Sequence, residues 1–281
     1  MIAHRFEYTV PATLDEALNL AGDGSSKILA GGMSLIPLMK LRLAAPDTLI
    51  DLARIPGLNQ ITESAAVVKI GAMATHNAVE TSPLIRGKCP LLGEAAGHIG
   101  DTQVRNVGTI GGSVAHADPS ADYPAALVAL EARIRLRSAQ GERLVEASEF
   151  FLDAFTTAME PGEIVVAVEI DEEQPSEGYK YEKVPHPASG FPVVGVAVRI
   201  KRAGSAVTLA RIGVTGMGAH AFRARKAEAL LVSGAEVTVA AAQVGEGEEA
   251  NSDLYASGEY RRHLAQVHAA RAIAAALTRA S

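Results

Sequence analysis

Residues 27–37 read KILAGGMSLIP and residues 108–122 read GTIGGSVAHADPSAD, and these two glycine-rich stretches decide how the chain is interpreted. Each places a Gly-Gly pair beside a hydroxyl residue. Glycine has no Cβ, so backbone N–H groups in such loops can approach a phosphate closely. Two loops of this kind predict a ligand with a diphosphate in its middle and something to hold at each end.

Neither loop matches the common phosphate-binding motifs. Neither continues into Gly-Lys-Ser/Thr, and neither fits G-x-G-x-x-G, which disfavours a P-loop nucleotide hydrolase and a standard dinucleotide-binding fold. A plain tight turn remains the alternative for each loop taken alone. The helix predicted to begin at Ser34 favours the binding role, because free N–H groups and partial positive charge gather at a helix N-terminus.

The composition narrows the class of protein. The 281 residues carry a formal net charge of −6 without a basic block, so nucleic acid is not an expected partner. No apolar run approaches the roughly 20 residues of a membrane-spanning helix, and the N-terminus lacks a signal-peptide core, which predicts a cytoplasmic protein. Cys89 is the only cysteine and no histidine cluster has metal-ligand spacing, so we expect no metal site and no iron–sulfur cluster on this chain. Redox chemistry would need an organic cofactor.

Hydrophobic periodicity and turn residues predict an ordered series of elements. Residues 1–55 are expected to form a β-α-β unit, with a helix at 13–21, a strand at 27–30, a helix at 34–43 and a strand at 48–52. The next predicted elements are strands at 67–73, 132–137 and 164–170 and helices near 76–81, 91–98 and 123–130. The acidic stretch 171–178 is a predicted linker. After it come strands at 193–201 and 206–213, a helix at 223–231 and a long alanine-rich helix at 258–280.

The motif residues resemble those of a known family. Residues 30–37 resemble the first FAD-binding motif of the flavin subunit of molybdenum hydroxylases, and residues 109–113 with Asp118 and Asp122 resemble the second. Residues 181–191 (YEKVPHPASGF) resemble the start of the C-terminal domain in the carbon monoxide dehydrogenase medium-subunit branch, and residues 257–262 (SGEYRR) resemble the family's last helix. The chain is therefore identified as a member of this xanthine dehydrogenase and carbon monoxide dehydrogenase family.

The resemblance implies an α+β fold in two domains. Residues 1–175 would form an FAD-binding domain of the PCMH type, made of two α/β subdomains at about 1–55 and 56–175. Residues 176–281 would form the C-terminal domain, a three-stranded antiparallel sheet with helices.

The resemblance also implies a division of labour among three chains. A large partner would carry the molybdenum cofactor and a small partner two [2Fe–2S] clusters, in a dimer of heterotrimers. This chain would hold FAD non-covalently and pass electrons to NAD or a quinone. One alternative is a self-contained FAD-dependent oxidoreductase of the same wider fold, which would need an acid or base beside the flavin. Another is a non-catalytic nucleotide-binding protein. The substrate is not predicted, because its site would lie on another chain.

Sixteen FAD-contacting residues follow from the resemblance. The first loop would wrap the diphosphate through its N–H groups, and the second would offer hydroxyl groups to phosphate or ribitol oxygens. The residues are Ala30, Gly31, Gly32, Met33, Ser34 and Leu35, then Thr109, Ile110, Gly111, Gly112, Ser113, Asp118 and Asp122, and finally Val165, Lys183 and Phe191. No catalytic residue is predicted.

The charged members of this set each have a second interpretation. Asp122 would bind ribose hydroxyls at the adenosine end of FAD, or place a charge at the N-terminus of the helix at 123–130. Asp118 would bind the ligand or only cap a turn. Lys183 would stabilise negative charge near the flavin, or be a solvated strand residue.

The apolar and aromatic candidates have the protein core as their alternative. Ile110 and Val165 would contact the flavin ring or belong to the core. Tyr181 or Phe191 would cover one face of the flavin, or pack inside the protein. His76, near a predicted helix start, is expected to be structural, and Cys89 is expected to be buried and inert.

Overall fold

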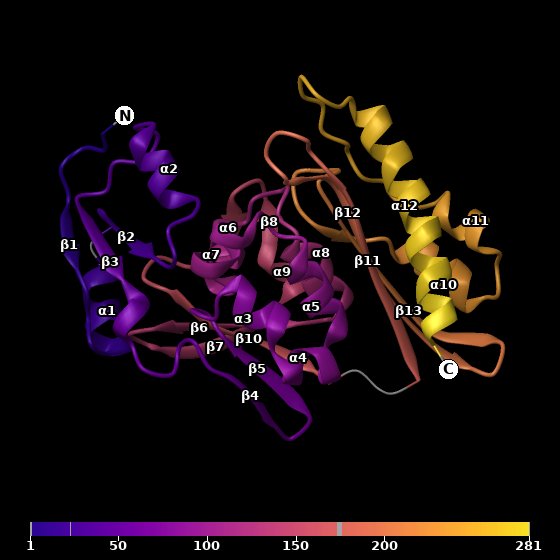
Figure 1. The fold of residues 1–281 in the computed structure, drawn as a ribbon, viewed down its shortest axis with the longest axis horizontal. Helices are drawn as coiled ribbons and strands as arrows, with labels where there is room; N and C mark the ends of the chain where they lie inside the picture. Colours follow the sequence, from indigo (N-terminus) through magenta and orange to yellow (C-terminus); the bar gives the residue numbers. More distant parts are fainter. Residues whose placement is uncertain (1, 23, 173–175, 281) are drawn as a thin grey trace.

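The computed structural model describes residues 2–22, 24–172 and 176–280, and its first part is a three-stranded parallel sheet (Figure 1). The elements are β1 (Glu7–Thr9), α1 (Leu14–Ala21), β2 (Ser26–Leu29), α2 (Leu35–Lys40), β3 (Thr48–Asp51) and the short 3-10 helix η1 (Leu52–Arg54). The spatial order of the strands is β1-β3-β2, and Ile50 lies opposite both Thr9 and Ile28. The β-α-β organisation predicted for residues 1–55 is confirmed, with the first glycine loop between β2 and α2.

The second part is a five-stranded antiparallel sheet that packs against a group of short helices. In spatial order its strands are β4 (Ile61–Ser64), β5 (Val67–Gly71), β10 (Ile164–Asp171), β6 (Arg133–Ser138) and β7 (Gly141–Glu146). The helices are α3 (His76–Thr81), α4 (Pro83–Lys88), α5 (Pro90–Gly97), α6 (Thr102–Val107), α7 (Ile110–His116), α8 (Tyr123–Ala129) and α9 (Ala147–Phe150). A small two-stranded sheet, β8 (Phe151–Asp153) with β9 (Thr156–Thr157), follows α9.

Strand β6 shows the alternation predicted from its sequence. Ile134 and Leu136 are fully buried in the core, whereas the three arginines that alternate with them lie on the other face of the sheet. Each arginine forms an ion pair with a carboxylate: Arg133 with Asp171 (2.7 Å), Arg135 with Glu169 (2.6 Å) and Arg137 with Glu142 (3.2 Å). The apolar face of the strand therefore holds the helices in place, and the opposite face carries a ladder of paired charges.

The predicted capping box starts α1 and orients the first part of the chain. Thr13 Oγ1 accepts a hydrogen bond from Glu16 N (3.2 Å), and Glu16 Oε2 accepts one from Ala12 N (2.8 Å). Ala17 and Leu18 of this helix are buried in a cluster shared with β3 and β10. That cluster attaches the first sheet to the second.

The third part is an antiparallel sheet of four strands, not the three that were predicted. Its strands are β11 (Glu177–Pro185), β12 (Pro192–Ala203), β13 (Ala206–Thr215) and β14 (Phe222–Arg223), in that order. The additional strand, β14, is only two residues long and pairs with Gly213 and Val214 after a turn, so it has no pattern of its own. The helices are α10 (Arg225–Val232), α11 (Val237–Ala241) and α12 (Gly258–Arg279).

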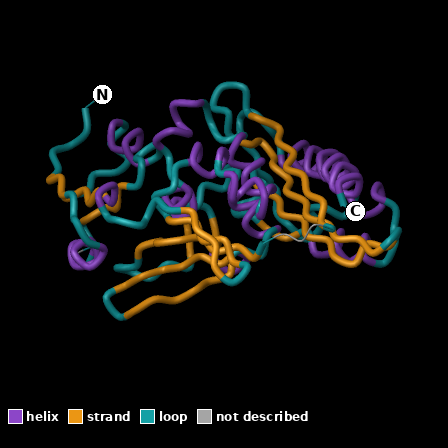
Figure 2. The backbone as a smooth tube through the Cα atoms, turned by 60° about the horizontal axis from the view of Figure 1, so that its bottom comes forward, coloured by secondary structure: helices purple, strands orange, loops and turns teal. Residues whose placement is uncertain are grey.

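Two helical layers cover the third sheet. Helix α12 runs along one face of the long strands (Figures 1 and 2), where Ile273 is fully buried. Helix α8 packs on the other face so closely that a Cβ on Gly213 would lie 2.0 Å from Ala125 O. Although α12 has 22 residues, no helix in the described ranges is long and apolar enough to cross a membrane.

Three predictions about element limits need correction or remain open. Helix α2 ends at Lys40 rather than near residue 43, because Arg42 adopts a φ of 62° and Leu43 N bonds back to Leu38 O (2.9 Å). The second glycine stretch, expected to be a loop, is already helical from Ile110. The predicted linker 171–178 includes residues 173–175, which lie outside the described residues, so the domain boundary at residue 175 stays a prediction.

Candidate functional site

The two glycine stretches, far apart in the sequence, touch each other in the structure. Thr109 Oγ1 donates a hydrogen bond to Ala30 O (3.2 Å), across 79 positions of sequence. A Cβ on Gly112 would lie 2.7 Å from Ala30 O, and a Cβ on Gly31 would lie 2.3 Å from Val107 O. The glycines are therefore required where the two stretches approach, because a side chain at either position would push them apart.

The first loop presents a run of free backbone donors. Gly31 and Gly32 adopt φ values of 80° and 78°, which turns the chain sharply after β2. The N–H groups of residues 31–35 have no hydrogen-bond acceptor among the described residues, and the next, that of Ile36, bonds to Gly32 O (3.0 Å). Ser34 forms no side-chain cap of α2, and the Met33 side chain is 40% exposed. Consecutive free backbone donors in one tight loop are the kind of arrangement that suits an anion.

The second stretch differs from the first, because its backbone donors are already used within the protein. Four of its N–H groups already bond inside the protein: Ile110 to Ala74 O (3.0 Å), Gly111 to Ala72 O (2.9 Å), Gly112 to Thr109 Oγ1 (3.2 Å) and Ser113 to Thr109 O (3.0 Å). A Cβ on Gly111 would lie 2.4 Å from Ala72 Cβ. The Gly-Gly pair thus lets α7 begin against the end of β5 and against the first loop. These four N–H groups are therefore not available for a phosphate.

Asp122 is buried at the N-terminus of α8, where its carboxylate is already paired. Lys183 Nζ lies 2.9 Å from one carboxylate oxygen, and Tyr181 donates its hydroxyl to the same oxygen (2.8 Å). Lys183 also donates to His98 O (2.7 Å). Burial raises the pKa of Asp122 to about 6, and the positive charge of Lys183 opposes that rise. The sequence placed Asp122 at the adenosine end of FAD and Lys183 near the flavin, whereas the structure brings them into direct contact.

Asp118 and His76 each bind other residues of the protein rather than facing an open site. Asp118 Oδ1 accepts a hydrogen bond from Ser120 N (2.8 Å), which is the turn-capping alternative. The buried His76 has Nδ1 3.2 Å from the Tyr123 hydroxyl, and burial lowers the pKa of His76 to about 4. A Cβ on Gly108 would lie 2.6 Å from His76 Nε2, so the neutral ring supports the chain where it enters the motif.

The remaining predicted contacts divide between the core and the surface. Ile110 and Val165 belong to the buried cluster between the second sheet and its helices, as their core alternative stated. Tyr181 is fully buried, and its hydroxyl is bonded to Asp122. Its ring is therefore not exposed on a binding face. Phe191 is 45% exposed on the connection between β11 and β12. Of the aromatic candidates, only Phe191 therefore presents a ring to solvent.

Sequence reasoning missed the residue that makes room for this buried group. Gly195 lies in the middle of β12, and a Cβ there would lie 2.4 Å from the Tyr181 hydroxyl. The signal that could have identified it is a glycine inside an otherwise apolar strand, since such a glycine often marks a close approach of another group.

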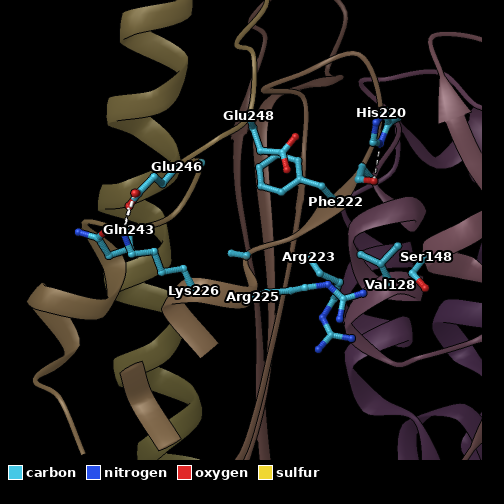
Figure 3. Close-up of a pocket in the computed structure, with 13 residues that line it drawn as sticks. Val128, Ser148, His220, Phe222, Arg223, Arg225, Lys226, Gln243, Glu246 and Glu248 are labelled. Atoms are coloured by element: carbon cyan, nitrogen blue, oxygen red, sulfur yellow. Dashed lines mark hydrogen bonds and ion pairs between the residues drawn. The ribbon is translucent and has the colours of Figure 1, made fainter. Parts of the chain in front are cut away.

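A cavity of about 390 Å³ lies away from the glycine stretches (Figure 3). It is lined by α8, α9, β14, the start of α10 and the loop 243–248 that follows α11, and none of the predicted FAD contacts borders it. Two of its cations are paired within the protein, Lys226 with Glu246 (2.5 Å) and Arg223 with Glu228 (2.6 Å). Nowhere in the described ranges do three His, Cys, Asp or Glu side chains converge as a metal site. The free donors of the first loop therefore remain the best-defined binding feature.

Two family profiles match consecutive parts of the chain. The profile described as "FAD binding domain in molybdopterin dehydrogenase" matches residues 4–171. The profile described as "CO dehydrogenase flavoprotein C-terminal domain" matches residues 179–276.

Individual proteins match over nearly the full length. The carbon monoxide dehydrogenase medium chain of Hydrogenophaga pseudoflava is 39% identical and covers 99% of both chains. Subunit alpha of the 6-hydroxypseudooxynicotine dehydrogenase complex of Paenarthrobacter nicotinovorans is 35% identical, covering 98% of this chain and 95% of its own. A solved structure of carbon monoxide dehydrogenase from H. pseudoflava, lacking the Mo-pyranopterin moiety of its cofactor, superposes with a TM-score of 0.97 at 40% identity over all of both chains.

Proposed function

Because the chain belongs to the family of FAD-binding medium subunits of molybdenum hydroxylases, we propose that it relays electrons from the [2Fe–2S] clusters of a partner chain through FAD to an external acceptor. The chain is the FAD-binding subunit of an oxidoreductase, and FAD supplies the chemistry of accepting and donating electrons. NAD and a quinone are the acceptor classes that we consider.

The first glycine loop is the observation that carries this proposal. A diphosphate needs several donors close together, and residues 31–35 offer five N–H groups that no acceptor in the described part of the chain occupies. The exposed Met33 side chain does not obstruct this role, because the donors belong to the backbone. We therefore assign the diphosphate of FAD to Gly31, Gly32, Met33, Ser34 and Leu35, with the Ala30 carbonyl fixing the loop to the second stretch.

The proposed role of the second stretch changes with the structure. Its N–H groups are used internally, so we assign it the positioning of the first loop and of α7. The Ser113 hydroxyl is the group that we propose to contact the cofactor there. Asp118 and Asp122 support the backbone between α7 and α8, through the turn at Ser120 and the buried pair with Lys183.

A relay fits the titratable groups around the motif better than a self-contained oxidoreductase does. That alternative needs an acid or base beside the flavin. His76 is buried against Tyr123, and Asp122 is committed to Lys183 and Tyr181. The one cysteine of the sequence, Cys89, is buried and cannot hold an iron–sulfur cluster by itself.

We infer that the chain works in a complex. The partners would be a large molybdenum-cofactor subunit and a small [2Fe–2S] subunit, in a dimer of heterotrimers, and a location in the cytoplasm stays a prediction. The two relatives, 39% and 35% identical, are named for different substrates. This supports a substrate site on another chain, because similar medium subunits accompany different activities.

Flavin reduction in the native complex tests the relay. We expect substrate to bleach the visible absorption of FAD only when both partner chains are present, and the purified medium chain to leave substrate unchanged. Turnover of substrate by the medium chain alone would overturn the proposal and favour the self-contained alternative. A complex that turns over with its FAD remaining oxidised would overturn it as well.

A further inference from the structure

The third sheet directs one row of residues toward the segment between α7 and α8. In the register of β11, β12 and β13, Lys183 lies opposite Gly195, and Gly195 lies opposite Thr215. Residues that lie opposite each other in a sheet share one face of it. We call Lys183, Gly195 and Thr215 the anchoring row. It lies on the face that packs against α8, since Lys183 binds Asp122 there.

Thr215 binds the backbone of this segment from the end of β13. Its side chain is fully buried, and Oγ1 lies 2.9 Å from Pro119 O and 2.8 Å from Ala121 O. One hydroxyl proton is shared between these two carbonyl groups. The next residue, Gly216, donates its N–H to Pro119 O (2.8 Å). Three consecutive residues of the segment are thus spanned by bonds from one strand end.

Gly195 leaves space for the side chains of Thr215 and Tyr181. A Cβ at this position would lie 2.9 Å from Thr215 Cγ2 as well as 2.4 Å from the Tyr181 hydroxyl. Tyr181 needs that space to reach Asp122 at the other end of the same segment. The segment 118–122 is therefore held from the C-terminal sheet at two carbonyl groups and at one carboxylate.

A buried arginine fixes the strand end that carries Thr215. Arg261, near the start of α12, donates Nη1 hydrogen bonds to Val193 O (2.6 Å) and Gly216 O (2.8 Å). Its Nη2 donates to the carboxylate of Asp253. These bonds tie β12, β13 and α12 together directly behind Thr215, so the hydroxyl is presented from a rigid support.

We propose that Thr215 is a positioning residue for FAD: it acts through the carbonyl groups of Pro119 and Ala121 and fixes the segment that follows the second glycine stretch. The inference rests on the proposed function, in which Ser113 of α7 contacts the cofactor and residues 118–122 support the backbone that follows α7. It assigns a role in cofactor binding to a side chain on the C-terminal sheet, about a hundred residues after the second glycine motif and about 180 after the first.

Paired substitutions in the full-length chain test this role. Thr215→Val keeps the shape of the side chain and removes the hydroxyl, whereas Thr215→Ser keeps the hydroxyl. We expect Thr215→Val to weaken FAD binding about tenfold, the ratio that corresponds to about 1.4 kcal/mol, measured by quenching of flavin fluorescence. The visible circular dichroism of the bound flavin should change with it. Thr215→Ser should restore both the affinity and the spectrum.

Ile273→Val provides the matched control, because Ile273 is buried against the opposite face of the same sheet. It should lower the melting temperature without changing the flavin spectrum. Thr215→Ala is the reserve variant, with the same expectation, if valine prevents folding.

Unchanged FAD binding in Thr215→Val, or an equal loss in Ile273→Val at equal melting temperature, would overturn the positioning role alone. Failure of the wild-type chain to bind FAD would instead overturn the proposed function.

Discussion

Gly31 shows how one missing Cβ controls the site. A side chain there would meet Val107 O at 2.3 Å, and the φ of 80° is unfavourable for any other residue by about 1–3 kcal/mol. We expect Gly31→Ala to weaken FAD binding at least about tenfold, because strain of this size must be relieved by moving the loop. Gly87→Ala is the control, since a Cβ at Gly87 meets nothing within 4 Å. Equal flavin content in both purified variants would contradict the assignment.

Asp122 is the residue that should give the protein a distinct dependence on pH. Its folded pKa of about 6 lies above the ordinary value of 3.8, so the folded chain binds this proton more tightly than the unfolded chain. Between about pH 4 and 6 the free energy of unfolding should fall as pH rises, by up to about 3 kcal/mol. The stabilisation is fully present at the acid end and is lost above about pH 6.

The isosteric variant Asp122→Asn should flatten this part of the stability profile. Denaturant titrations across the pH range measure it, with Asp15→Asn, at an exposed carboxylate, as the control. An unchanged slope between pH 4 and 6 in Asp122→Asn would mean that Asp122 does not retain its proton in the folded state.

At the scale of elements, the start of α7 packs closely against the end of β5 because Gly111 has no side chain. Gly111 is packed against Ala72, with a virtual Cβ 2.4 Å from the alanine Cβ and 2.7 Å from its carbonyl oxygen. We expect Gly111→Ala to lower the free energy of unfolding by about 1–3 kcal/mol even without FAD, because overpacking forces the backbone to shift. Ser113→Ala, on the same helix, should leave the flavin-free chain about as stable as wild type. If Gly111→Ala affected only the flavin-loaded form, the glycine would serve the ligand rather than the packing.

Elements with a strong local pattern were predicted well, and elements without one were not. The capping box at Thr13 predicts α1, and the alternation around Ile134 predicts β6. Both patterns involve only residues that are close together in the sequence. The two-residue strand β14 depends on pairing with β13, which no local pattern encodes. Helix α7 was missed because glycines disfavour a helix locally, whereas here the contact with Ala72 decides.

At the scale of the whole molecule, α8 joins the second and third parts. Tyr181 and Ala197 of the third sheet belong to the same buried cluster as the residues of α8. We therefore expect one cooperative unfolding transition by calorimetry. Gly213→Val should split it into two, because the Cβ would meet Ala125 O at 2.0 Å and separate the helix from the sheet. Two transitions in the wild-type chain would contradict this account of the core.

The candidate site was predicted only in part. The motif residues of the first loop are brought together as expected, because the turn, the glycines and the following helix are consecutive in sequence. The pairing of Asp122 with Lys183 could not be predicted, since it depends on how the C-terminal sheet docks on α8. The same holds for Thr215, whose partners lie 94 and 96 positions away.

The contact between Ala30 and Thr109 also bears on the order in which the protein matures. The first glycine loop is fixed in place only when stretches 79 positions apart have met, and closing so long a loop comes late in folding because its entropy must be overcome first. A nascent chain that has released only its first hundred residues therefore has the first loop without the support of Thr109. Loading of FAD should follow folding of the N-terminal region rather than guide it, and a flavin shortage in the cell should leave folded but empty chains instead of unfolded ones.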